Sequence, residues 1–72
     1  MKKQYNIEID CAVCANKVQE AIKKIDGVTF CTVNYILQKM TIEIDDGKDF
    51  SAVLKQAVKL AKSIESDFEI EL

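Results

Sequence analysis

The stretch "IEIDCAVCANKV", residues 7–18, contains the junction from which both the fold and the chemistry of this chain are inferred. Apolar and polar residues alternate up to Asp10, as in a strand with one buried face. From Ala12 onward, apolar residues recur every three or four positions, which is typical of an amphipathic helix. Cys11 and Cys14 stand where the two patterns meet. The sequence therefore predicts a strand, a short loop and a helix, with two thiols at the helix N-terminus.

The same two patterns continue along the chain, and short turns separate the segments. Strands are expected at residues 4–10, 28–35, 38–44 and 66–72, and helices at residues 12–26, closing on Gly27, and 50–64. In the last strand, Phe68, Ile70 and Leu72 are expected to face the interior. Asp49 or Ser51 is expected to cap the second helix, because both side chains accept hydrogen bonds from free backbone N–H groups.

The order β-α-β-β-α-β predicts an α+β fold of the ferredoxin-like class, a four-stranded antiparallel sheet with two helices on one face. The regular alternation in the strands fits a sheet that is covered on one side only. A chain of 72 residues has the size of one domain, residues 1–72. Its last strand runs to the final residue, so the domain is also considered as a fragment of a longer protein.

Composition and charge exclude several functions. The net charge is -2, from 10 basic and 12 acidic residues, so the chain lacks the basic surface that phosphates require, and no nucleic acid is expected as a partner. No apolar run approaches the ~20 residues of a bilayer-spanning helix, and the N-terminus lacks the apolar core of a secretory signal. We therefore expect no membrane insertion of this chain and a cytoplasmic location.

The two thiols of Cys11 and Cys14 can converge above the helix N-terminus, where free N–H groups and the helix dipole favour thiolates. Two sulfurs suffice for Cu(I), whereas Zn(II) and related ions take about four ligands and accept carboxylate oxygen. Asp10 is the candidate third ligand. Two thiolates and a carboxylate leave a charge of about -1 around a divalent ion and about -2 around a monovalent one. The acid therefore favours a divalent metal, Zn²⁺ or Cd²⁺, with Pb²⁺ and Cu⁺ as alternatives.

Several residues have a second interpretation. Asp10 is also a candidate N-cap of the helix. Cys31 is expected in the core, because free cysteines are usually buried. Glu65 and Asp67 are expected in a solvated turn, with outer metal ligands as the alternative, and Lys17 is expected to be a plain surface lysine or to offset the charge of the site. A thiol–disulfide redox protein is a competing class, although the chain has no proline or tryptophan.

The element order together with "DCAVCA" (residues 10–15) resembles the heavy-metal-associated domain of copper chaperones and metal-transporting P-type ATPases. The resemblance covers the whole chain, including "DGV", "VNY" and "ESDFEI". Copper members usually carry methionine two places before the first cysteine and threonine or serine just before it, where this chain has Ile9 and Asp10. An acid directly before C-x-x-C is similar to the pattern in the zinc, cadmium and lead exporting branch of the family. That branch has an acidic Glu-Pro-Asp segment, which "SIESDFEI" resembles, with Ser66 in the place of the proline.

The resemblance implies that the metal ligands are Cys11, Cys14 and Asp10. It implies the cytosolic metal-binding or regulatory domain of a heavy-metal-translocating P-type ATPase, which is not an enzyme by itself. A free-standing copper(I) metallochaperone is the alternative. The implied partners are the metal ion and other domains of a membrane ATPase or a metal-donor protein. We expect mainly a monomer, with a metal-bridged dimer as the alternative.

Overall fold

The computed structural model describes all 72 residues, from Met1 to Leu72. Its elements are, in chain order, β1 (Lys2–Glu8), α1 (Ala12–Lys23), β2 (Val28–Asn34), β3 (Lys39–Ile44), α2 (Phe50–Ile64) and β4 (Glu69–Glu71). The predicted order of strands and helices is therefore confirmed.

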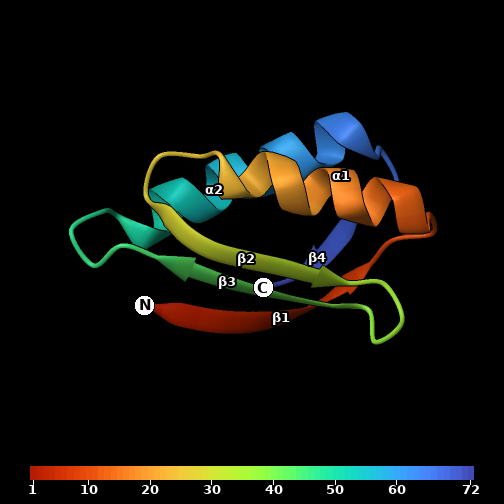
Figure 1. Cartoon of the computed structure of the whole chain (residues 1–72), viewed down its shortest axis with the longest axis horizontal. Helices are drawn as coiled ribbons and strands as arrows, with labels where there is room; N and C mark the ends of the chain where they lie inside the picture. Colours follow the sequence, from red (N-terminus) through yellow and green to blue (C-terminus); the bar gives the residue numbers. More distant parts are fainter.

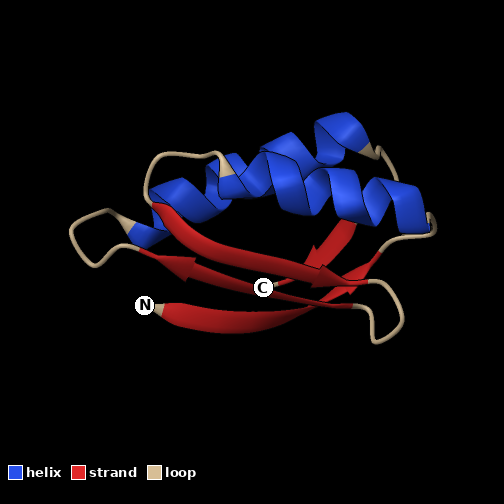
Figure 2. Cartoon of the chain, in the orientation of Figure 1, coloured by secondary structure: helices blue, strands red, loops and turns tan.

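The four strands form one sheet in the order β2-β3-β1-β4, and every neighbouring pair is antiparallel. Both helices lie on the same face of this sheet (Figure 1), and the opposite face is left uncovered (Figure 2). The structure therefore has two layers, as predicted for the ferredoxin-like class. The β1–α1, β2–β3 and α2–β4 connections all lie at one end of the molecule (Figure 1).

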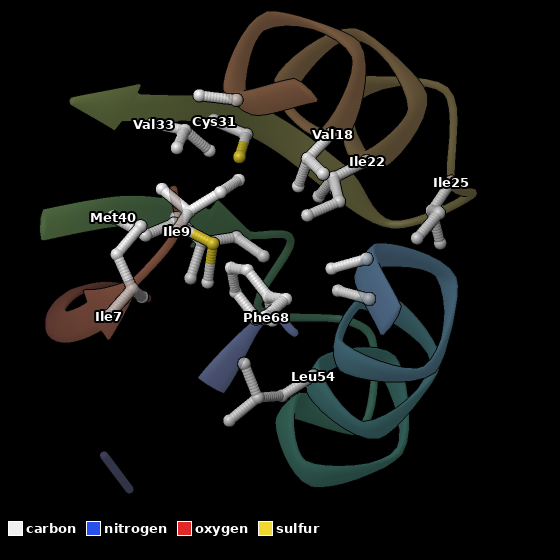
Figure 3. Packing of buried hydrophobic residues seen from close by; sticks show 14 of the residues in the cluster. Ile7, Ile9, Val18, Ile22, Ile25, Cys31, Val33, Met40, Leu54 and Phe68 are labelled. Atoms are coloured by element: carbon white, nitrogen blue, oxygen red, sulfur yellow. The ribbon is translucent and has the colours of Figure 1, made fainter. Parts of the chain in front are cut away.

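The core lies between the sheet and the helices, and it consists of apolar side chains only. Sixteen residues are buried, and none of them is polar or charged. Figure 3 shows the ring of Phe68 in the middle of this cluster, between the sheet residues around Ile9 and Leu54 of α2. Cys31 is 2% exposed, which confirms its predicted place in the core. Apolar burial on this scale is the main source of stability for so small a domain.

Helix α1 ends at Lys23, so its predicted extension to residue 26 is wrong. The N–H groups of Lys24 and Ile25 each bond the carbonyl three residues earlier, at 3.1 and 3.0 Å, because the last turn tightens before the chain reverses. Gly27 follows with a φ of +99°, a conformation that favours glycine.

Helix α2 begins after Asp49, whose carboxylate accepts hydrogen bonds from the backbone N–H groups of Ser51 and Ala52 at 3.1 and 3.4 Å. Of the two predicted caps, Asp49 is therefore the one that the structure uses. No helix of the structure is both long enough and apolar enough to cross a bilayer.

The predicted strand ends are partly wrong. β1 begins at Lys2 instead of residue 4, because it pairs with β3 from Lys2 onward. In the last segment, Phe68 is fully buried and Ile70 is half-buried, as predicted, but Leu72 is 76% exposed. β4 is a three-residue edge strand whose ladder with β1 ends at Glu71, so no neighbouring strand holds Leu72 over the core.

Candidate metal centre

The two cysteines lie on the connection between β1 and α1. The chain leaves β1 with the side chain of Ile9 buried in the core at 2% exposure. Cys11 then takes an extended conformation, with φ -128° and ψ 118°, and α1 begins at Ala12. Cys14 therefore falls in the first helical turn, as predicted. Both cysteines are free and half-buried, unlike the buried Cys31, and Cys14 packs against the edge of the core.

A direct hydrogen bond links the two cysteines. The backbone N–H of Cys14 donates to Sγ of Cys11 at 3.2 Å. Cys11 is the N-cap of α1, and its sulfur takes the place that an oxygen usually has in such a cap. One of the free N–H groups of the helix end is thereby satisfied by a prospective metal ligand.

The two thiols differ in acidity. Hydrogen bonds from the side chain and the backbone N–H of Cys14 lower the pKa of Cys11. The hydrogen bond with Cys11, partial burial and a hydrogen bond with Glu65 raise the pKa of Cys14 to about 11. The sequence predicted that the helix end would favour both thiolates, and this holds for Cys11 alone. In the metal-free pair, Cys14 holds its proton and Cys11 accepts from it.

Asp10 precedes the cysteine pair and is exposed. The interpretation of Asp10 as the N-cap is wrong, because α1 starts at Ala12 and Cys11 occupies the capping position. Instead, the backbone carbonyl of Asp10 accepts a hydrogen bond from the hydroxyl of Tyr35 at 3.4 Å. The carboxylate makes no hydrogen bond or ion pair within the chain, so it is available to a ligand.

Glu65 lies closer to the pair than the sequence indicated. It is the C-cap of α2 and is half-buried, and its carboxylate contributes to raising the pKa of Cys14. The β-α-β-β-α-β order placed this loop at the same end of the sheet, but the order could not predict an effect on the pKa of a thiol. Asp67 and Lys17 are both exposed, and Lys17 takes part in none of the ion pairs. Both fit the surface interpretation.

Gln38 has a role that its place in the sequence, at the start of a predicted strand, did not indicate. Its side-chain Oε1 accepts a hydrogen bond from the N–H of Ile9 at 2.8 Å, and its Nε2 donates to the carbonyl of Ile9 at 3.0 Å. The β2–β3 turn is thereby joined to the segment just before Cys11. No local sequence signal marks such a contact, since the partners are 29 positions apart.

The structure contains no group of three or more Cys, Asp or Glu side chains spaced to hold a metal ion, and the chain has no histidine. The two sulfurs are therefore the donors that the backbone brings together directly. The carboxylates of Asp10 and Glu65 lie on neighbouring segments, but neither forms a three-residue metal-binding group with the two cysteines.

The fold and the site together define a small two-layer module that presents a free thiol pair on the loop before its first helix. A protein-family model, the heavy-metal-associated domain, matches residues 4–67. The chain belongs to this family, as the resemblance of its sequence implied.

Relatives in the family have different functions. The chain is 33% identical over 66 residues to a cadmium, zinc and cobalt-transporting ATPase of Bacillus subtilis, and 36% identical over 58 residues to a copper-exporting P-type ATPase of the same organism. The matches cover 90% and 79% of this chain, but only 9% and 7% of the two ATPases. Among solved structures, a CopZ metallochaperone superposes with a TM-score of 0.73 at 25% identity, covering 99% of this chain and all of that one.

Proposed function

We propose that this chain binds a soft heavy-metal ion through the thiols of Cys11 and Cys14, as cargo and not as a resident cofactor. The observation that carries the proposal is the pairing of two accessible sulfurs at the N-terminus of α1, where the pKa of Cys11 is lowered. Membership of a family described as heavy-metal-associated supports it. Thiolates prefer soft ions such as Zn²⁺, Cd²⁺, Pb²⁺ and Cu⁺ to hard ones.

We favour a divalent ion, Zn²⁺ or Cd²⁺, with Pb²⁺ accepted by the same ligands. Two acidic side chains, Asp10 and Glu65, stand near the sulfurs, and a carboxylate beside two thiolates is balanced better by two positive charges than by one. Divalent ions of this kind also accept mixed sulfur and oxygen ligands. An open shell of two sulfurs and one oxygen leaves a position for water or for a ligand from a partner, which suits an ion that is passed on.

Asp10 is the third ligand in this proposal, because its carboxylate is exposed, unpaired and adjacent to Cys11. Glu65 is a second candidate for this role, because its carboxylate helps to raise the pKa of Cys14. Its Oε1 accepts a hydrogen bond from the backbone N–H of Asp67 at 3.1 Å, which holds the carboxylate on the α2–β4 turn. If Asp10 is the third ligand, its substitution should weaken metal binding, and if Glu65 is the ligand, the substitution of Glu65 should do so.

A copper(I) metallochaperone is the alternative function. Two sulfurs satisfy Cu⁺ without any carboxylate. The similarity to the copper-exporting ATPase and to the CopZ structure supports this alternative. Ile9, where copper members carry methionine, is buried at 2% exposure and faces the core. The residue at this position therefore affects packing and gives no argument about ligands.

A thiol–disulfide redox function remains the competing proposal from the enzyme class. The difference in acidity between Cys11 and Cys14 is also what thiol–disulfide exchange requires, since a low-pKa thiol is the better nucleophile at neutral pH. A redox protein cycles at a defined potential whether metal is present or not. A metal site is held reduced by its ion, so the reduction potential with and without equimolar Zn²⁺ separates the two functions.

In the cell, we propose that the domain is the cytosolic metal-binding or regulatory part of a heavy-metal-translocating P-type ATPase, and that it is not catalytic by itself. The similarity to the cadmium, zinc and cobalt-transporting ATPase supports this role, although that match covers 9% of the ATPase. Its partners are then the metal ion and the other domains of the pump, or a metal-donor protein. We propose mainly a monomer, with a metal-bridged dimer as the alternative.

The test is competition against chelators of known affinity, with buffered Cd²⁺, Zn²⁺ and Cu⁺ added to the reduced protein. We expect Asp10→Ala to weaken divalent binding at least about tenfold and Cu⁺ binding much less. Glu65→Gln tests the second candidate, and Asp67→Asn is its matched control, because Asp67 is an exposed acid in the same loop. Equal losses of all three metals in Asp10→Ala would remove Asp10 as a ligand that selects divalent ions.

The Cys11→Ser and Cys14→Ser double variant tests the thiol site itself. Reduced wild-type protein should give a sulfur-to-cadmium charge-transfer band on titration with Cd²⁺, and the double variant should give none. An undiminished band in the double variant, or no band in the wild type, contradicts the proposal.

A further inference from the structure

Gln38 has an unusual backbone conformation. Its φ is +54°, and it is the only residue other than glycine with a positive φ. Side chains with a Cβ are disfavoured in this region, whereas glycine is not. Glycine would be less strained at this position, so the presence of glutamine suggests that its side chain has a specific role.

The side chain of Gln38 takes the place of a strand residue opposite Ile9. The backbone carbonyl of Gln38 accepts from the N–H of Ile7 at 2.9 Å, which is a contact just past the end of the β1–β3 ladder. Two residues further along, the Gln38 amide bonds both the N–H and the carbonyl of Ile9, at 2.8 and 3.0 Å. A primary amide presents an acceptor and a donor side by side, as the C=O and N–H of a strand residue do, so it extends the pairing by one step.

The same amide is anchored on its own turn. Its Nε2 also donates to the carbonyl of Tyr35 at 2.6 Å, and the turn is closed by a hydrogen bond of 2.9 Å from the N–H of Leu37 to Oδ1 of Asn34. The hydroxyl of Tyr35 reaches the carbonyl of Asp10 at 3.4 Å. The β2–β3 turn thus holds the two residues that directly precede Cys11.

We propose that Gln38 is a positioning residue for the metal site: its side-chain amide clamps the backbone of Ile9 and thereby orders the segment that carries Cys11. This inference rests on the proposed function, since it concerns the same two thiols. Because the segment is already ordered without metal, binding an ion costs less conformational entropy.

The strained backbone of Gln38 destabilises the folded protein, whereas its hydrogen bonds to Ile9 stabilise the segment before Cys11. A variant that removes both can therefore distinguish a positioning role from a stabilising one. Gln38→Gly removes both hydrogen bonds to Ile9 and also removes the strain of the positive φ. A residue that mattered only for stability would change metal binding through the folded fraction alone. A positioning residue lowers metal affinity in protein that is fully folded.

The experiment compares wild type with Gln38→Gly, Gln38→Glu and Gln4→Ala. Gln38→Glu retains the acceptor for the Ile9 N–H and loses the donor for its carbonyl. Gln4→Ala is the matched control, because the amide of Gln4 bonds Thr41 on the exposed face of the sheet at 3.3 Å. For each protein we would measure amide hydrogen exchange of Ile9 and Cys14 without metal, the Kd for Cd²⁺, and unfolding by urea.

For Gln38→Gly we expect exchange of the Ile9 amide to rise about tenfold and the Kd for Cd²⁺ to rise about tenfold, under conditions where the protein stays folded. Gln38→Glu should lie between Gln38→Gly and wild type, and Gln4→Ala should match wild type. If Gln38→Gly does not fold, the comparison of Gln38→Glu with Gln4→Ala decides.

An unchanged Kd in the folded Gln38 variants, or unchanged exchange at Ile9, overturns the positioning role. Wild-type protein that binds no Cd²⁺ contradicts the proposed function instead. The two failures are distinguishable, because hydrogen exchange of the metal-free protein reports on the clamp without any metal.

Discussion

The backbone N–H of Cys14 donates a hydrogen bond of 3.2 Å to the sulfur of Cys11, so the first cysteine caps the helix that contains the second. The two chemically identical residues are unequal because of the contacts between them. A hydrogen bond from the Cys14 side chain and, second to it, this backbone N–H stabilise negative charge on Cys11 and lower the pKa of that thiol. Cys14 receives no such stabilisation and keeps its proton, with a pKa raised to about 11.

The first prediction concerns alkylation of the three thiols. With limiting iodoacetamide near neutral pH, Cys11 should be modified first and Cys14 more slowly, because the thiolate is the nucleophile. Cys31 should stay unmodified, since it is 2% exposed and burial raises its pKa to about 11. Fragment mass spectrometry of the modified protein gives the order. In urea all three should react alike, and a native protein in which Cys14 reacts first would contradict the asymmetry.

The second prediction concerns the pH dependence of metal binding. Cys14 has a raised pKa of about 11, so its protonated form dominates at neutral pH and must lose the proton when metal binds. Raising the pH removes that competition, so Cd²⁺ binding should strengthen by about tenfold per pH unit from about pH 7 to 9. Competition titrations at several pH values check this. The slope should flatten in Cys14→Ser, and a pH-independent Kd in wild type would contradict the assignment.

The third prediction contrasts the two apolar residues that flank β4. The ring of Phe68 is fully buried at the centre of the core, so Phe68→Ala should lower the free energy of unfolding by about 3–5 kcal/mol. Leu72 is 76% exposed, and Leu72→Ala should change it by less than about 0.5 kcal/mol. Urea denaturation of both variants provides the measurement. Comparable losses would mean that Leu72 packs more tightly than its exposure implies.

The fourth prediction concerns Gly27, which has a φ of +99°. A Cβ at this position would lie 2.9 Å from Cγ of Lys48, so Gly27→Ala adds both backbone strain and a close contact. We expect it to lower the free energy of unfolding by about 1–2 kcal/mol. Gly47→Ala is the control, because a Cβ there meets only Oδ1 of Asp45 at 3.5 Å. If both variants are equally stable, the left-handed conformation of Gly27 is not required.

Much of the fold was predictable from local patterns. The alternation in residues 38–44 and the three- and four-residue repeats in residues 50–64 gave the right elements, because a side chain's place along a strand or helix decides whether it reaches the core. The patterns failed at ends, where other contacts compete. Helix α1 stops at Lys23 although the apolar repeat continues to Ile25, and Leu72 alternates correctly but has no neighbouring strand to hold it inward.

The sequence by itself determined the order of the elements and the place of Cys11 and Cys14 at a helix N-terminus, since both follow from spacing along the chain. Only the tertiary structure decided that Glu65 raises the pKa of Cys14 and that the Gln38 amide holds Ile9. Those features depend on side chains that meet across the β1–α1, β2–β3 and α2–β4 connections. Contacts between residues so far apart in the sequence leave no periodic trace in it, because they are made by packing the two layers together.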